Sequence, residues 1–110
     1  MSTPMTTQWH DVGSSDDVSE DMPLTARIGE REIGVFMHGG HYYAMEDVCP
    51  HAYALLSQGF MMGEEVECPL HGARFNITSG QCTQEPGGRD LRTYPVKVEG
   101  GRVLVGLTAA

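Results

Sequence analysis

Hydrophobic and polar residues alternate with a period of two over several stretches of the chain, which is typical of half-buried β-strands. Leu24, Ala26 and Ile28 alternate with polar neighbours, and Val96 and Val98 do the same near the C-terminus. In such a strand one face lies on the core and the other faces water. We therefore expect Val96 and Val98 on a buried face.

Two glycine pairs each separate two segments of this kind. Gly39-Gly40 lies between 33–38 and 41–45, and Gly100-Gly101 lies between 94–99 and 102–107. Glycine takes the positive φ angles that tight two-residue hairpin turns require. Both places are therefore predicted to be β-hairpins.

The beginning of the chain is predicted to contain one edge strand. Residues 1–8 are polar and are interpreted as a flexible leader, so the first strand is expected to begin near Trp9. Trp9 itself is expected in the core. The acidic segment 13–21 is expected to be a solvated loop or one short helical turn.

The middle of the chain, residues 47–91, differs from both ends. It holds all three cysteines, two of the five histidines and six glycines. Apolar residues at helical spacing between Ala52 and Phe60 allow a short helix, which would end at Gly59. The chain contains 14 Gly and 6 Pro, a proportion that favours a turn-rich all-β fold over a helical bundle.

Length and charge restrict the function further. At 110 residues the chain is expected to form a single domain. A net charge of -8 argues against non-specific binding to nucleic acid or to an anionic membrane, and acidic pairs such as Glu64-Glu65 favour a basic protein partner. We find no membrane-spanning or signal segment and expect a cytoplasmic location, where the cysteines are first interpreted as metal ligands or buried thiols.

Two short segments carry the candidate chemistry. They are Cys49-Pro50-His51 and Cys68-Pro69-Leu70-His71-Gly72, and each offers one thiolate and one imidazole. Together they form a four-ligand set that suits zinc or an iron–sulfur cluster. A zinc finger usually groups its cysteines and its histidines separately, whereas here they are interleaved. Interleaving suits a [2Fe–2S] rhomb in which one iron takes both thiolates and the other takes both imidazoles.

These two segments resemble the ligand boxes of the Rieske family, and the resemblance extends over residues 9–107. It implies an all-β, Rieske-like fold, in which an antiparallel β-sandwich base domain carries a smaller cluster-binding subdomain of two ligand loops at about 47–91. It also implies one Rieske-type [2Fe–2S] cluster, held by Cys49, His51, Cys68 and His71.

Within the family, the chain is similar to the ferredoxins of bacterial ring-hydroxylating dioxygenase systems. The resemblance implies a soluble one-electron carrier with no catalytic residues of its own. Its partners would be a flavin-containing, NAD(P)H-dependent ferredoxin reductase and a terminal aromatic-ring-hydroxylating oxygenase. Two alternatives stay open: the small Rieske-like subunit of a reductase such as nitrite reductase, and a zinc-binding interaction module.

Respiratory Rieske proteins differ from this sequence around the cluster. The positions that match their extra disulfide are Ala54 and Leu70, so that bridge is absent here. The positions that match their two hydroxyl donors to sulfur are Ala73 and Phe75, which cannot donate such bonds. The resemblance therefore implies a reduction potential toward the low end of the Rieske range, roughly -150 mV. Cys82 lies outside both boxes and is expected to be a free, buried or half-buried thiol.

Overall fold

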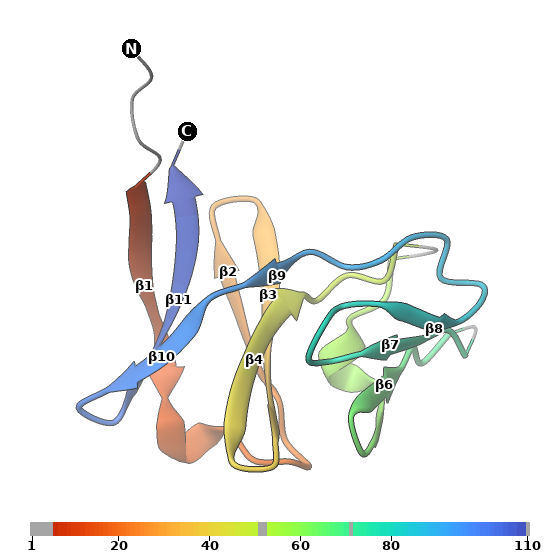
Figure 1. Cartoon of the computed structure of the whole chain (residues 1–110), viewed down its shortest axis with the longest axis horizontal. Coiled ribbons are helices and arrows are strands. Elements are labelled where there is room, and N and C mark those ends of the chain that lie inside the picture. Colours follow the sequence, from red (N-terminus) through yellow and green to blue (C-terminus); the bar gives the residue numbers. More distant parts are fainter. Residues whose placement is uncertain (1–5, 51–52, 71, 110) are drawn as a thin grey trace.

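The structure is a computed structural model that describes residues 6–50, 53–70 and 72–109, and almost all of its regular structure is antiparallel β (Figure 1). The strands are β1 (Thr6–Ser14), β2 (Leu24–Ile28), β3 (Arg31–His38), β4 (His41–Glu46), β5 (Phe60–Met62), β6 (Glu65–Glu67), β7 (Arg74–Asn76), β8 (Cys82–Gln84), β9 (Thr93–Tyr94), β10 (Val96–Glu99) and β11 (Arg102–Ala109). Two single 3₁₀ turns, η1 (Ser15–Asp17) and η2 (Leu56–Gln58), complete the described elements. Neither turn is long and apolar enough to cross a membrane.

Two sheets form a base of β-sandwich type. One has the strand order β1-β11-β10 and the other the order β2-β3-β4-β9. Their facing side chains form one core, whose buried members are Val18, Ile33, Val35, Ala44, Val103 and Val105. The predicted all-β sandwich base is thus confirmed.

Both predicted hairpins are present. β3 pairs with β4 in a register that places His38 opposite His41, and β10 pairs with β11. The turn residues Gly39, Gly40, Gly100 and Gly101 all have positive φ, between 57° and 79°. The glycine pairs therefore occur where the backbone requires them.

The middle strands of the sheet β2-β3-β4-β9, β3 and β4, are covered on both faces. Ile33 and Val35 of β3 belong to the base core, whereas Phe36 belongs to a second core together with Met45 of β4. A strand buried on both faces has no solvent-facing positions to fill with polar residues. This explains why residues 33–37 are almost continuously apolar and do not alternate.

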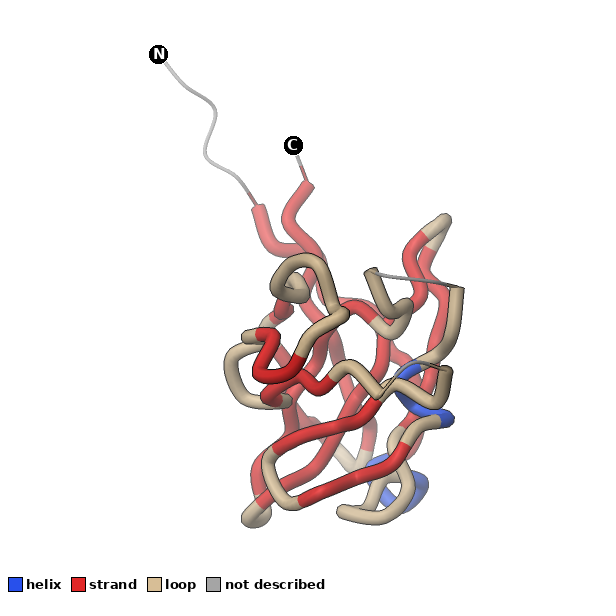
Figure 2. The backbone as a smooth tube through the Cα atoms, turned by 90° about the vertical axis from the view of Figure 1, so that its right-hand side faces the viewer, coloured by secondary structure: helices blue, strands red, loops and turns tan. Residues whose placement is uncertain are grey.

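The second core lies between the base and a smaller subdomain with a sheet of its own. This sheet has the strand order β5-β6-β7-β8 and lies beside the base, on the right in Figure 1. Figure 2 shows the molecule with this subdomain toward the viewer. From the sequence, this subdomain was predicted only as two ligand loops, and its four strands were not predicted. The expected helix is only the turn η2, although it does end at Gly59.

Three details near the edges differ from the predictions. β1 begins at Thr6, so it takes in the last residues of the segment interpreted as a leader. Trp9 is 40% exposed and Val98 is 39% exposed, so neither is a core residue. β10 lies at the edge of its sheet, and the ammonium group of Lys97 lies 4.3 Å from the centre of the Trp9 ring. Trp9 therefore packs under a cation at the surface.

Candidate metal centre

The first candidate box begins a six-residue loop, 49–54, between the base and η2. It is closed by a single isolated β-bridge between Val48 and Leu55. The backbone N–H of Cys49 donates to the carbonyl oxygen of Ala54 at 2.9 Å. The cysteine is thus the first residue of the loop, and its backbone is tied to the last.

The second box lies in a loop of the same length, and a hydrogen bond of the same kind closes this loop. It spans 68–73 in the β6–β7 hairpin and is closed by the pair Glu67 and Arg74. The N–H of Cys68 donates to the carbonyl oxygen of Ala73 at 2.7 Å. The two loops are therefore alike in length and in the hydrogen bond that closes them, although the spacing from cysteine to histidine differs between them.

The residues present fit a metal group that takes two thiolates. Cys49 is 2% exposed and Cys68 is 1% exposed, and both belong to the core between base and subdomain. His51 and His71, the two predicted imidazole ligands, lie outside the described residues. Among the residues that the structure describes, no three metal-binding side chains come together, and this set includes only two of the four predicted ligands.

A buried carboxyl group braces the first loop. Asp47 is fully buried, and it accepts hydrogen bonds from the backbone N–H of Ser57 at 2.7 Å and from its hydroxyl at 2.6 Å. A third donor, the hydroxyl of Thr25, lies 3.2 Å away. Burial raises the pKa of Asp47, and these hydrogen bonds oppose that rise. In the sequence Asp47 looks like an ordinary surface acid, and nothing there indicates its burial.

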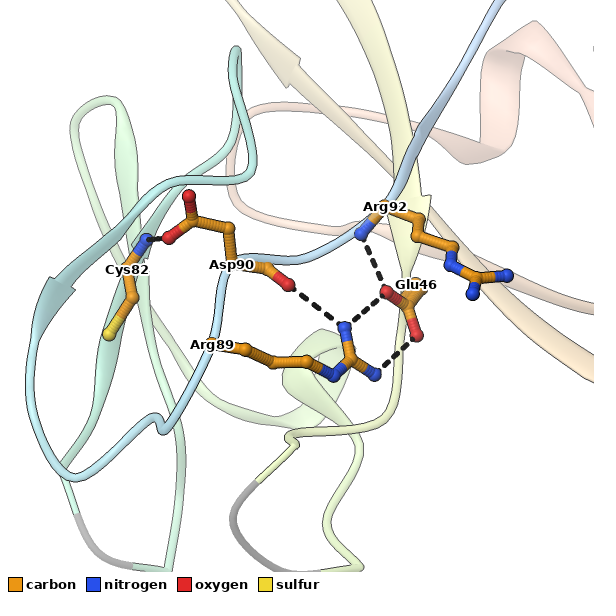
Figure 3. A network of polar contacts seen from close by, with 5 residues as sticks. All are labelled: Glu46, Cys82, Arg89, Asp90 and Arg92. Atoms are coloured by element: carbon orange, nitrogen blue, oxygen red, sulfur yellow. Dashed lines mark hydrogen bonds and ion pairs between the residues drawn. The ribbon is translucent and has the colours of Figure 1, made fainter.

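An ion pair ties the end of the subdomain back to the base (Figure 3). The Glu46 carboxylate accepts from both terminal nitrogens of Arg89, at 2.9 and 3.0 Å, and from the backbone N–H of Arg92 at 2.6 Å. Burial by itself raises the pKa of Glu46. The hydrogen bonds from Arg89 and Arg92 together lower this pKa by more, so that it lies below its usual value. We call this contact the Glu46–Arg89 latch. Its partners are 43 residues apart, and sequence reasoning missed it.

The second loop has a brace of its own. The side-chain amide of Gln84, on β8, donates to the carbonyl oxygen of Gly72 at 3.0 Å. At the base of the loop, the guanidinium of Arg74 pairs with the Glu67 carboxylate at 3.0 Å. Ala73 and Phe75, the positions predicted to lack sulfur-directed donors, are both fully buried.

Cys82 is a free thiol and is half-buried, as predicted. Burial and a hydrogen bond to Glu85 raise the pKa of this thiol. A raised pKa favours the protonated thiol over the thiolate. The side chain packs against Gly87, where an added Cβ would lie 2.5 Å from the sulfur.

Comparison with known proteins decides which metal group suits the two loops. A family model for the Rieske [2Fe-2S] domain matches residues 8–95. The chain belongs to the Rieske family. Its cofactor is therefore a Rieske-type [2Fe–2S] cluster, which accepts and releases one electron when bound, and the zinc alternative is dropped.

Individual relatives show which group within the Rieske family this chain resembles. It is 38% identical over 101 residues to the ferredoxin component of the naphthalene 1,2-dioxygenase/salicylate 5-hydroxylase systems of a Ralstonia species, covering 92% of this chain and 97% of the relative. It is also similar to the ferredoxin in a solved complex of reduced oxygenase and oxidised ferredoxin of carbazole 1,9a-dioxygenase. The TM-score is 0.81 at 34% identity, and the match covers 88% of this chain and 91% of that one. These relatives are electron carriers of multicomponent dioxygenase systems, so this Rieske domain is a ferredoxin and not itself an oxygenase.

A third likeness concerns the remaining alternative. The putative small subunit of an NADH-dependent nitrite reductase from Mycobacterium tuberculosis has a TM-score of 0.82 at 21% identity, covering 96% of this chain and 99% of that one. At that identity the likeness shows the shared fold alone.

Proposed function

We propose that this Rieske ferredoxin carries single electrons from a flavin-containing, NAD(P)H-dependent ferredoxin reductase to a terminal oxygenase that acts on an aromatic ring. The observation that carries the proposal is near full-length similarity to a ferredoxin component of a naphthalene dioxygenase system. The structure of a related ferredoxin with its oxygenase supports the second half of this route.

We propose Cys49, His51, Cys68 and His71 as the cluster ligands, within one Rieske domain over residues 9–107. Two loops of equal length that each begin with a buried cysteine support the two thiolates. The histidines are assigned from their places in the same two loops. A free thiol at Cys82 suits a reducing compartment and supports a location in the cytoplasm.

The route can be tested in two steps with purified proteins. Mixing the oxidised ferredoxin with NADH and the reductase of a naphthalene dioxygenase system should bleach its visible absorption. Mixing the reduced ferredoxin anaerobically with the oxidised oxygenase of that system should restore the ferredoxin's absorption. In a stopped-flow experiment this recovery should be complete within the first seconds. Failure of both steps, with a protein that contains intact cluster, would refute the proposal.

Charge is proposed to guide these encounters. The chain has a net charge of -8, and Glu64 lies exposed in the turn between β5 and β6, next to the half-buried Glu65. β6 separates this turn from the second ligand loop by three residues, about 10 Å of strand. Electrostatic steering raises the association rate of transient complexes more than their affinity. The rate of reduction by the reductase should therefore fall as salt is added.

A pair of double variants separates steering near the cluster from a general effect of charge. Glu64→Lys with Glu65→Lys should slow reduction by the reductase. Asp16→Lys with Asp17→Lys changes the net charge equally, but these residues are exposed on η1 at the lower end of β1, on the side of the base away from the subdomain (Figure 1). Equal slowing by both double variants, or a rate that does not fall with salt, would remove the acidic turn from the docking surface.

A further inference from the structure

The two ligand loops are equivalent in length but not in support. The second loop sits in the β6–β7 hairpin, where three consecutive residue pairs hold the strands together. Around the first loop, the described residues form the isolated bridge between Val48 and Leu55 but no paired strands. Its flanking segments need another restraint to hold the same geometry.

Asp47 supplies contacts across the open ends of the first loop. It lies two residues before Cys49, and its side chain bonds the backbone N–H and the hydroxyl of Ser57, three residues after the loop. The Asp47 carbonyl oxygen also accepts from the N–H of Leu56 at 2.7 Å. Side chain and backbone of one residue thus span the whole loop.

The same residue fixes the loop to the base. The Asp47 backbone N–H donates to the carbonyl oxygen of Glu32 on β3 at 3.0 Å, and the Thr25 hydroxyl on β2 reaches the carboxyl group at 3.2 Å. Gly34 makes room for it, because a Cβ there would lie 2.9 Å from the Asp47 carboxyl oxygen. A carboxyl group is expensive to bury unless its oxygens are hydrogen-bonded. Here the carboxyl oxygens accept from the Ser57 N–H, the Ser57 hydroxyl and the Thr25 hydroxyl.

We propose that Asp47 is a positioning residue of the cluster: its contacts with Ser57 and Thr25 substitute for the missing hairpin and hold the first ligand loop in one geometry. Asp47 does not itself bind the metal. The proposal depends on the Rieske cluster bound between the two loops but on neither of the proposed redox partners.

Ser57→Ala gives the cleanest test, because it removes the 2.6 Å hydroxyl contact without changing any charge. We expect broadened g-features in the electron paramagnetic resonance (EPR) spectrum of the reduced protein, because the loop then samples several geometries. Iron release to a strong chelator should become about 2- to 10-fold faster, the factor that one hydrogen bond is worth. Ser57→Thr keeps the hydroxyl and should restore both readouts, whereas Thr25→Val removes the longest contact and should have a smaller effect.

A control separates positioning from general stability. Val103→Ala opens a cavity at a fully buried position of the base core and touches neither loop. It should lower the melting temperature and leave the EPR spectrum unchanged. The proposal is overturned if Ser57→Ala has the wild-type spectrum and iron-release rate, or if Val103→Ala broadens the spectrum equally. Because each measurement uses the isolated ferredoxin, a failure here is distinct from a failure to exchange electrons with the partners.

Discussion

Replacing Arg89 by glutamine removes the ion pair that ties the cluster-binding subdomain to the base. Both terminal nitrogens of Arg89 bond the Glu46 carboxylate, and the Glu46 side chain is only 20% exposed. The variant leaves this carboxylate with the Arg92 backbone N–H as its remaining hydrogen-bond donor. We expect the segment that leads from the subdomain into β9 to become less firmly attached to the base.

The magnitude follows from the geometry and exposure of the pair. Hydrogen bonds to a charged group contribute about 1.5–3 kcal/mol when shielded from solvent. The Arg89 side chain is 54% exposed, so solvent screening reduces the total to about 1–2 kcal/mol. For a domain near this size, that loss corresponds to a fall of roughly 4–15 °C in melting temperature.

Arg102→Gln is the matched control. Arg102 also makes a two-pronged pair, with Asp11 on β1, but both side chains are about half exposed and the pair lies within the base. Thermal unfolding should be followed at one scan rate by circular dichroism in the far ultraviolet and at the cluster bands. We expect Arg89→Gln to lower both midpoints clearly and Arg102→Gln to lower them much less. Equal midpoints for the two variants would refute the special contribution of the latch.

The latch also predicts a dependence on pH. The pKa of Glu46 in the folded protein lies below its usual value of 4.5. A lowered pKa contributes stability that is fully present above 4.5 and is lost as pH falls through the folded-state pKa. The difference in midpoint between wild type and Arg89→Gln should therefore be constant near neutral pH and shrink below pH 4.5. A difference that grows on acidification would contradict this assignment.

Four further variants test the centre and its immediate surroundings. Cys68→Ser should abolish the cluster and Cys82→Ser should retain it, as measured by iron and sulfide content; loss of iron in the Cys82 variant would show that the ligand set is wrong. Ala73→Ser should raise the reduction potential by about 40–60 mV if its hydroxyl bonds a cluster sulfur, since a tenfold change in equilibrium is 59 mV for one electron; voltammetry showing no rise would contradict the interpretation of Ala73 as a missing donor. Gly59→Ala would place a Cβ onto the carbonyl oxygen of Glu67, just before Cys68, and should cost about 1–3 kcal/mol of unfolding free energy; a wild-type urea midpoint would show that the backbone there yields.

Features with a local cause were predictable from the sequence. Each glycine pair requires positive φ whatever the rest of the fold does, so both hairpins could be placed. The ligand boxes could be found because four metal-binding side chains at short spacings are chemically distinctive. The edge of a sheet has no such signal, which is why Trp9 and Val98 were wrongly expected in the core.

Features that depend on distant contacts could not be predicted. β6 and β7 have three residues each, and each has a single buried residue, Val66 or Phe75, so no periodicity can build up. The equivalence of the two loops is a matter of backbone closure and is hidden by their unequal cysteine–histidine spacings. Asp47 is buried against Gly34 of β3, which lies 13 residues earlier in the chain and where a Cβ would lie 2.9 Å from the Asp47 carboxyl oxygen.

The central claim is that two thiolates and two imidazoles hold one [2Fe–2S] cluster, and pulsed EPR of the reduced protein tests it most directly. The chain has three cysteines, so a cluster with a third thiolate would have to recruit Cys82. With ¹⁵N-labelled histidine we predict couplings to two histidine nitrogens bound at the iron, unchanged in Cys82→Ser. A single coupled histidine nitrogen, or none, would contradict the account.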